Sequence, residues 1–347
     1  MNGLEAREFR PVLRALIAGT DLDAQTMAGA VGAIMDAEWS PVQSGAFLAA
    51  LASKGETVDE VVGAAEAMRA RSLHVEHGID EVFDTCGTGG DGAHTLNIST
   101  AVGFVVAGCG VAVAKHGNRA ASSRCGSADV LEAAGIAIDA SPAAAAASLQ
   151  RDGFAFLFAQ RYHPAMKEVG PVRRDLGVRT VFNLLGPLAN PARATRQVIG
   201  VAAPAAVELM GEALAGLGAR SGAIVHAASG IDEVAGDAQT SVHHFDARGV
   251  RRYTIDPSAF GIRASAGDIA GGEPAENARA LRDVLAGERS PRADVIALNA
   301  ALALVVAERA ESLAEGLHEA RKSLREGAAL AVFESARGAV PRRGEPG

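Results

Sequence analysis

The sequence predicts an α/β protein with a small all-helical domain and a larger α/β domain, whose mostly parallel central sheet is flanked by helices. A length of 347 residues with 48% hydrophobic content allows about two domains with buried cores. The first part of the chain has helix signals and almost no strand signal. After residue 81, strand-like apolar runs alternate with helix-like segments, and this alternation is typical of a parallel sheet covered by helices.

The small helical domain is predicted over residues 1–72, where the helix boundaries are well marked. Ser40 and Pro41 have the residue types of an N-cap followed by a first-turn proline. Thr57 and Glu60 have the spacing of a capping box for the next helix. Several short helices are therefore expected in this part of the chain.

The larger domain is predicted over residues 73–163 and 192–337. Val82 and Phe83 run into a glycine-rich turn, a helix-like segment follows, and a second strand signal at Val111–Ala114 completes a β-α-β unit. Ala-rich or Leu-rich helical segments separate several of the later strand candidates. These candidates are Phe154–Phe158, Gln197–Val201, Gly222–Val225 and Val242–Phe245.

Two segments fall outside the alternating pattern. Residues 164–191 are apolar, carry arginines and end in Gly186, Pro187 and Pro191, so helix and hinge are predicted, joined to the small domain. Residues 338–347 are rich in Pro, Gly and Arg without any periodicity, and a disordered tail is predicted there.

Charge and composition exclude several classes of function. The net charge of −8 argues against a general affinity for nucleic acid, which requires a basic surface. The three cysteines, Cys86, Cys109 and Cys125, have neither disulfide nor zinc-site spacing, and they favour a reducing compartment. The apolar stretch Val102–Ala114 is too short to span a bilayer. We therefore expect a cytoplasmic protein with neither nucleic acid nor membrane as a partner.

A glycine-rich loop after the first predicted strand indicates a phosphate site. The loop Gly87–Gly92 reads GTGGDG and precedes Asn97–Thr100 at the start of a helix. Glycines let the backbone approach an anion closely, and the exposed N–H groups at a helix start point at it. The same letters also satisfy G-x-G-x-x-G, so a dinucleotide site and a plain tight turn stay open as alternatives.

The end of the second predicted strand favours a ligand with several phosphates. A dinucleotide fold places an acidic residue there, whereas this chain has Lys115–Arg119, which reads KHGNR. Two cations and a histidine suit a diphosphate, although Arg119 would also serve the phosphate of NADP. The small residues of Ser122–Ser127 follow, either as a cradle for the far end of the same ligand or as a plain loop with an N-cap.

An acidic pair follows a later predicted strand. Asp232 and Glu233 come after this strand and the turn Ser229–Gly230. Adjacent carboxylates at the carboxyl end of a strand suit Mg²⁺ that bridges to a diphosphate. An isolated acidic pair on a solvated surface is the alternative.

Two arginines provide a candidate site for a flat aromatic carboxylate. Arg173 and Arg174 lie in the predicted helical segment, shortly after Tyr162 and His163. A guanidinium beside aromatic and apolar surface binds a carboxylate through a bidentate contact. Two surface arginines on a helix are the alternative.

These motifs together resemble the successive signatures of bacterial anthranilate phosphoribosyltransferases. The resemblance extends from the helical start to about Ala336, nearly the whole chain. It departs from the commonest family pattern at Arg124, Cys125, Gln160 and Arg161. The matching segments, in the same order, are Gly87–Asp91, Asn97–Thr100, Lys115–Arg119, Ser127–Leu131, Tyr162–Met166, Arg179–Pro191 and the pair Asp232 and Glu233.

The resemblance implies transfer of the phosphoribosyl group of 5-phosphoribosyl 1-diphosphate to anthranilate, the second step of tryptophan biosynthesis from chorismate. It also implies a homodimer formed through the helical domain and two Mg²⁺ ions per subunit. By motif, Ser99 and Glu233 would hold one ion, and Asp232 with Glu233 the other.

The resemblance also implies which residues contact the two substrates. No nucleophile is implied, and Lys115 and His116 are candidates for positioning or electrostatic roles. The implied anthranilate contacts are Gly87, Asn118 and Arg173. The implied donor contacts are Gly87, Gly90, Asp91, Thr95, Asn97, Ile98, Ser99, Thr100, Lys115, His116, Gly117, Asn118, Arg119, Ala120, Ala121, Ser122, Ser123 and Ser127.

Three other functions are compatible with parts of the sequence. A pyrimidine nucleoside phosphorylase on a similar fold would use free phosphate and no divalent ion. An NADP-dependent reductase would use the glycine loop for its cofactor. A non-catalytic paralogue would bind phosphoribosyl diphosphate or nucleic acid, but the acidic pair and Arg173 argue against it, and the net charge argues against its nucleic-acid form.

Overall fold

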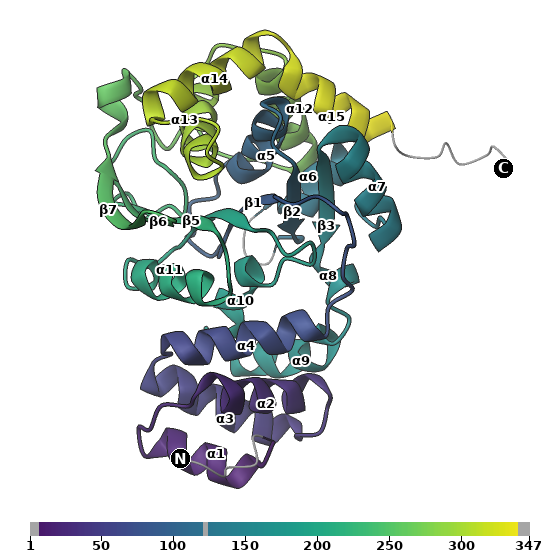
Figure 1. The fold of residues 1–347 in the computed structure, drawn as a ribbon, viewed down its shortest axis with the longest axis vertical. Helices are drawn as coiled ribbons and strands as arrows, with labels where there is room; N and C mark the ends of the chain where they lie inside the picture. The colour runs from purple at the N-terminus through teal and green to yellow at the C-terminus, as the bar shows by residue number, and fades with distance from the viewer. Residues whose placement is uncertain (1–6, 121–123, 339–347) are drawn as a thin grey trace, which may run out of the picture.

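The computed structural model describes residues 7–120 and 124–338, which form an elongated molecule with a helical end and a sheet-containing end (Figure 1). Two helices begin at the predicted N-caps: Thr57 forms the predicted capping box with Glu60, and Ser40 forms a further one with Gln43. The amino-terminal helices form the helical end and are α1 (Phe9–Ile17), α2 (Ala24–Met35), α3 (Pro41–Lys54) and α4 (Val58–Ala70).

Two later helices pack against the amino-terminal helices. Helix α9 (Met166–Leu176) packs on α2 and α3, although it follows them by more than a hundred residues. Helix α10 (Phe182–Leu188) packs on α4 and also contacts strand β2. The segment predicted as helix and hinge therefore connects the two ends of the molecule.

A seven-stranded sheet in the order β3-β2-β1-β4-β5-β6-β7 forms the centre of the other end. The first five strands are parallel and the last two pair antiparallel, so the predicted α/β class with a mostly parallel sheet is confirmed. The strands are β1 (Phe83–Gly87), β2 (Val113–Gly117), β3 (Phe154–Phe158), β4 (Arg196–Gly200), β5 (Ser221–Ala227), β6 (Thr240–Asp246) and β7 (Gly249–Ile255).

Two strand predictions differ from the structure. The second strand was predicted over Val111–Ala114, but β2 begins at Val113 and runs on through Lys115 to Gly117. Lys115 is almost fully buried, so its polar side chain concealed the continuation of the strand. The edge strand β7 was missed because most of its residues are exposed and it lacks an apolar face.

Helices cover both faces of the sheet. Along β4, Val198 belongs to the apolar cluster under α5 and α13, while Ile199 belongs to the cluster that contains the helical end and α11. Neighbouring residues of a strand face opposite sides, so the sheet is buried on both faces. The remaining helices are α5 (Ile98–Gly108), α6 (Ser127–Ala133), α7 (Pro142–Asp152), α8 (Ala159–Tyr162), α11 (Ala206–Gly216), α12 (Pro274–Leu285), α13 (Pro291–Val306), α14 (Leu313–Arg325), α15 (Ala328–Gly338) and the 3-10 turn Pro257–Phe260.

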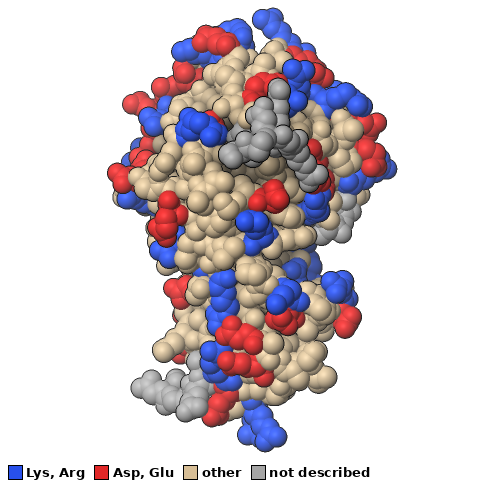
Figure 2. Space-filling model, turned by 90° about the vertical axis from the view of Figure 1, so that its right-hand side faces the viewer, with Lys and Arg blue, Asp and Glu red and all other residues tan. Residues whose placement is uncertain are grey.

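The surface charges are mixed. On the face drawn in Figure 2, acidic and basic side chains alternate, and no broad basic area of the kind that nucleic acid requires is visible there. Of the helices in residues 7–120 and 124–338, none combines the length and apolar content needed to cross a bilayer. Helix α15 ends at Gly338, the first residue of the predicted tail, and the rest of that tail lies outside the described residues.

Candidate active site

The predicted ligand-binding segments meet at one edge of the sheet. Strands β1, β2, β4 and β5 are parallel, so their carboxyl ends lie at the same edge. The glycine loop follows β1, the segment Lys115–Arg119 completes and follows β2, and Asp232 with Glu233 follow β5. The sequence motifs that are far apart in the chain are thus brought together.

The glycine loop is in direct contact with the acidic pair. The backbone N–H of Gly89 donates a hydrogen bond to Asp232 Oδ2 over 2.9 Å. A Cβ atom at Gly87 would collide with the same carboxylate, so this position requires glycine for close approach. Gly89, Gly90 and Gly92 have φ of 65°, 77° and 72°, in the left-handed region that favours glycine.

The second carboxylate lies at the start of α5, beside a buried lysine. The backbone N–H of Ser99 donates to Glu233 Oε1 over 3.2 Å. Lys115 Nζ donates to Ser99 Oγ over 3.1 Å and to the carbonyl oxygen of Thr85 over 2.6 Å. Lys115 is only 1% exposed, and burial lowers the pKa of its ammonium group, while the nearby Asp84 and Glu233 carboxylates favour its charged form.

The electrostatics of this cluster favour a bound cation. Burial, and after it the neighbouring Asp91 carboxylate, raise the pKa of Asp232 to about 6. Burial and the charge of Asp232 also raise the pKa of Glu233, and Lys115 opposes this shift only in part. Both carboxylates therefore gain from a divalent cation that neutralises them.

The protein supplies only part of a metal coordination shell. In the described parts of the chain, no three His, Cys, Asp or Glu residues are placed so that they alone hold a metal ion. Mg²⁺ commonly uses one or two carboxylates and takes its remaining oxygens from substrate phosphates and water. The pair Asp232 and Glu233 with the Ser99 hydroxyl fits a magnesium ion of this kind.

A pair of buried histidines lies behind the end of β2. His116 Nδ1 is 2.9 Å from the carbonyl oxygen of Gly186, which can only accept, so Nδ1 carries the proton and donates. His163 Nε2 lies 3.2 Å from His116 Nε2 and must donate to it. Burial lowers the pKa of His116 to about 4 and of His163 to about 3. Both imidazoles are therefore neutral at pH 7.

These two histidines should make the fold sensitive to acid. Their folded pKa values lie below that of an unfolded histidine, about 6.5, so their contribution is complete above pH 6.5 and is lost as the pH falls towards 4. We expect His163→Gln to flatten the fall of the unfolding free energy between pH 6.5 and 4, by up to about 1.4 kcal/mol per pH unit. Denaturant titrations at pH 7, 6 and 5 measure this slope. The exposed His318→Gln is the control, and an equal slope in both variants would contradict the prediction.

A buried carboxylate ties the strand ends to the connecting segment. Asp84 Oδ1 accepts a hydrogen bond from the backbone N–H of His116 over 3.2 Å. Its Oδ2 accepts one from Asn190 Nδ2 over 2.8 Å. Burial raises the pKa of Asp84, while the charge of Lys115 lowers it. Asp84 therefore positions the backbone of His116, and no local pattern in the sequence indicates this role.

Arg119 does not point at an open ligand site. Its guanidinium forms ion pairs with Asp129 and Glu132, and it lies over the ring of Phe158 at 5.6 Å from the ring centroid. Asp129 Oδ2 also accepts from the backbone N–H of Ala120 and Gly126, each over 2.9 Å. In this structure the Arg119 side chain therefore helps to hold this loop, and its contact with the donor stays a prediction.

Two arginines from the connecting segment approach the site. Arg173 is partly buried, with its guanidinium 5.9 Å from the ring centroid of Phe182 in α10, the helix whose Gly186 accepts from His116. Arg174 is exposed. Arg179 begins the matching segment Arg179–Pro191 but is not among the contacts implied by the resemblance. A Cβ atom at Gly90 would lie 2.6 Å from its Nη1. Its guanidinium therefore lies directly over the glycine loop.

The other predicted contacts differ in what they offer to a ligand. Ile98 and Thr100 are buried in α5, so only their backbone is available. Asn97 Nδ2 donates to the carbonyl oxygen of Cys125, and Ser127 Oγ donates to that of Asn118. Thr95 forms an isolated bridge with the chain that leads into α12. Gly117 is near Ser127, and Ala121, Ser122 and Ser123 lie outside the described residues.

Family models match most of the chain. Residues 10–72 match the helical bundle domain of a glycosyl transferase family, and residues 79–330 match the a/b domain of a glycosyl transferase family. A protein named anthranilate phosphoribosyltransferase from Thermomicrobium roseum is 50% identical over 328 residues, covering 93% of this chain and 94% of that protein.

Solved structures give the same picture. Anthranilate phosphoribosyltransferase from Thermus thermophilus has a TM-score of 0.90 at 42% identity, covering 94% of this chain and 98% of that chain. The Saccharomyces cerevisiae enzyme, in complex with PRPP and Mg, has a TM-score of 0.88 at 26% identity, covering 96% and 98%. A further structure of the yeast enzyme contains 4-fluoroanthranilate. The resemblance noted from the motifs is confirmed, and the chain belongs to the anthranilate phosphoribosyltransferases, which transfer a phosphoribosyl group to anthranilate in tryptophan biosynthesis.

Proposed function

We propose that this chain carries out phosphoribosyl transfer to anthranilate with the donor's diphosphate and Mg²⁺ held together at the carboxyl ends of β1, β2 and β5. One observation carries the proposal, namely the hydrogen bond between the N–H of Gly89 and Asp232 Oδ2. It makes the acidic pair part of the glycine loop, so a metal on the acids and a diphosphate on the loop would be in contact. The direct test is loss of anthranilate fluorescence in a mixture of the protein, phosphoribosyl diphosphate, anthranilate and Mg²⁺. No loss of fluorescence would contradict the proposal.

The metal site that we propose uses Ser99, Asp232 and Glu233 and holds two Mg²⁺ ions. Ser99 and Glu233 are joined by a hydrogen bond, and Asp232 precedes Glu233 in the chain. When bound, Mg²⁺ supplies positive charge against the negative charge that develops on the departing diphosphate. The raised pKa values of both carboxylates support a cation between them.

Lys115 is proposed to stabilise the leaving group. In the reaction, the bond between the anomeric carbon and the diphosphate oxygen breaks, and its electron pair leaves with the diphosphate. Lys115 Nζ is held in position by Thr85 and Ser99 before the reaction begins, and the negative charge of the bound diphosphate would favour its charged form. The amine of anthranilate is already neutral at pH 7, so its nitrogen can attack the same carbon without prior deprotonation, and the nitrogen then releases one proton to water. No side chain is assigned as a nucleophile.

The acceptor is proposed to bind between the glycine loop and the connecting segment. Gly87 and Asn118 lie at the strand edge, and Arg173 would hold the carboxylate of anthranilate in a bidentate contact. The neutral imidazole of His116 suits the wall of a site for an aromatic ring. We add Arg179 to the predicted residues as a further cation for the donor, because its guanidinium covers Gly90.

Arg173→Ala should weaken the use of anthranilate and leave the donor almost unaffected. Loss of a bidentate charged contact corresponds to about 1.5 to 3 kcal/mol, so we expect the KM for anthranilate to rise about 10- to 100-fold. Steady-state kinetics with each substrate varied in turn measure the effect. The neighbouring exposed Arg174→Ala is the matched control. An unchanged KM for anthranilate in Arg173→Ala would remove Arg173 from the acceptor site.

The membership of the family decides against the rival functions. The NADP reading also has a structural objection, because the end of β2 carries Lys115 and His116 instead of an acidic residue for the ribose. A nucleoside phosphorylase would use no divalent ion, so it would not need the acidic pair. Phosphorolysis of a pyrimidine nucleoside in the absence of Mg²⁺ would support that function instead.

We also propose that residues 1–72 and 164–191 form one helical domain, joined to the domain of residues 73–163 and 192–337, and that the protein is a homodimer through the helical domain. The packing of α9 on α2 and α3 supports the first point. Ile17 in α1 is 72% exposed and Val42 in α3 is 82% exposed, which supports an apolar contact there. A solution mass equal to one chain would rule out the dimer.

We further propose that the protein works in the cytoplasm. The three cysteines are free, and free cysteines suit a reducing compartment.

A further inference from the structure

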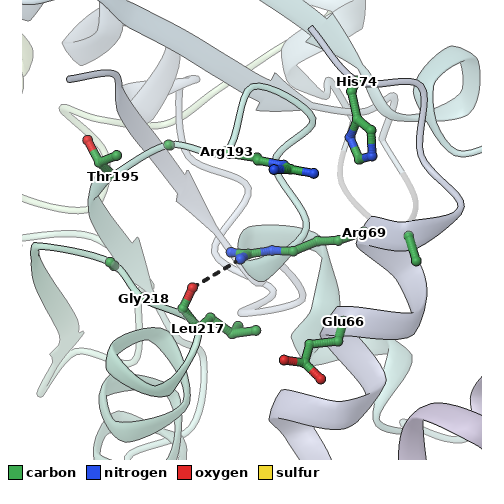
Figure 3. Close-up of a pocket in the computed structure, with 10 residues that line it drawn as sticks. Glu66, Arg69, His74, Arg193, Thr195, Leu217 and Gly218 are labelled. Atoms are coloured by element: carbon green, nitrogen blue, oxygen red, sulfur yellow. Dashed lines mark hydrogen bonds between the residues drawn. The ribbon is translucent and has the colours of Figure 1, made fainter. Parts of the chain in front are cut away.

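A pocket of about 490 Å³ lies away from the proposed active site, between the helical end and the sheet (Figure 3). It is bordered by the end of α4, the end of α11 and the segment that leads into β4. Since Thr195 precedes the first residue of β4, the pocket faces the amino end of that strand, opposite to the edge where the proposed substrates bind. None of the residues assigned above to substrates or metal lines it.

Two arginines extend into this pocket. Arg69 comes from the last turn of α4 and Arg193 from the loop before β4, and Figure 3 shows both side chains in the same space. Arg69 Nε donates to the carbonyl oxygen of Leu188 over 2.7 Å, and its Nη1 donates to that of Leu217 over 3.3 Å. These bonds fix the guanidinium but do not neutralise it. Burial lowers the pKa of Arg69, and the charge of Arg193 lowers it further.

The backbone presents Arg193 in an unusual conformation. Its φ is 50°, in the left-handed region that residues other than glycine rarely adopt. The loop is held by Asn190, whose carbonyl oxygen accepts from the N–H of Arg193 over 3.0 Å and whose Oδ1 accepts from Ala192. A strained position that directs a charged side chain into a pocket points to a use for that charge.

Nearby arginines show the ordinary arrangement. Arg196 forms ion pairs with Glu81 and Glu308, and Arg220 pairs with Glu81. By contrast, neither Arg69 nor Arg193 forms an ion pair with any carboxylate of residues 7–120 and 124–338. The two pocket arginines are thus close to each other and lack the compensation that their neighbours have.

One acidic residue also lines the pocket. Glu66 lies one helical turn before Arg69 in α4, and its charge favours the charged form of Arg69, but less than Arg193 opposes it. Glu66 is exposed and makes no ion pair with either arginine among the described residues. Its carboxylate therefore weakens the positive field of the pocket without filling it.

We propose that this pocket binds a small phosphate-bearing anion between Arg69 and Arg193. A phosphate group has several acceptor oxygens for two guanidinium groups, and it would relieve their mutual repulsion. The volume leaves room for a modest organic group attached to the phosphate. The remaining lining residues include His74 on the segment that leaves α4 and Thr195 on the segment that enters β4. A ligand there would connect the two segments that join the helical end to the sheet.

Calorimetric titration of the full-length protein with inorganic phosphate tests the site. Arg193→Gln removes a charge whose side chain has no hydrogen bond within the described residues, and we expect about tenfold weaker phosphate binding. Glu66→Gln removes the opposing charge, and we expect tighter binding. Arg10→Gln removes an exposed charge on α1 and is the matched control with unchanged binding. Phosphate at the glycine loop contributes equally to all four proteins, so the differences report on the pocket.

Two outcomes would overturn the proposal. One is phosphate binding that is equal in Arg193→Gln and Arg10→Gln at matched thermal stability. The other is that succinate binds to the wild-type protein as tightly as phosphate and is lost in Arg193→Gln, which would assign the pocket to carboxylates. The proposal is supported if phosphate binds more weakly to Arg193→Gln and more tightly to Glu66→Gln, and if succinate shows neither change.

Discussion

Turnover should fall by about 10³-fold or more when both acids of the pair are replaced by amides, in Asp232→Asn combined with Glu233→Gln. The amides keep the size of the side chains and can still accept from the N–H groups of Gly89 and Ser99. They cannot neutralise a divalent cation, so the charge on the departing diphosphate would lose its main stabilisation. The rate of anthranilate fluorescence loss, followed over a range of Mg²⁺ concentrations, measures the effect.

Stability separates this loss from misfolding. The carboxylates are costly to bury, as their raised pKa values indicate, so the amide variant should unfold at an equal or higher free energy than the wild type in the absence of Mg²⁺. Asp237→Asn, at an exposed position four residues further on, is the control and should keep full activity. Full activity of the double variant at low Mg²⁺ would remove the pair from the mechanism.

Local signals explain why most of the fold was predictable. The capping boxes at Ser40 and Thr57 need only residues three positions apart, so they are visible in the sequence and present in the structure. Apolar runs such as Phe154–Phe158 identify strands that are buried on both faces. The edge strand Gly249–Ile255 is different, because its exposed side chains carry no apolar pattern.

The site was predictable where topology alone brings residues together. In a parallel sheet the ends of successive strands share one edge, so the glycine loop, Lys115 and the acidic pair had to be neighbours if the strands were correctly identified. Arg179 and Asp84 were not predictable in this way. Their roles depend on how the connecting segment folds back on the strand ends, and no local spacing records that contact.

The ion-pair partners of Arg119 could not be predicted from the sequence either. Arg119 lies in a basic motif, and its position alone favoured a phosphate contact. In the structure, Asp129 and Glu132 on the next helix take its guanidinium. A motif fixes which residue types are near a ligand, whereas competition from neighbouring carboxylates decides which of them are free to bind it.

Gly200→Ala is expected to disable the site without touching any substrate. Gly200 ends β4, and its carbonyl oxygen accepts from the N–H of Thr88 in the glycine loop over 2.9 Å. A Cβ atom at Gly200 would collide with the backbone carbonyl group of Asp232. Backbone atoms cannot rotate aside as a flexible side chain does, so either β4 or the acidic segment must move. We expect a fall of kcat/KM of about 10²-fold or more and a loss of about 1 to 3 kcal/mol in unfolding free energy.

The result shows whether β4 supports both the glycine loop and the acidic segment, or whether these two loops keep their positions independently. If β4 holds both sides of the site in register, Gly200→Ala should raise the Mg²⁺ concentration needed for half-maximal rate together with the KM for the donor, because the glycine loop and the acids shift relative to each other. Gly45→Ala in α3 is the control and should change neither quantity, because its new methyl group would meet only the side chains of Val172 and Leu176 in α9, at ordinary contact distance. A variant at Gly200 that is less stable but has an unchanged Mg²⁺ requirement would mean that the acids keep their position without β4, and that the glycine loop alone sets the geometry of the donor.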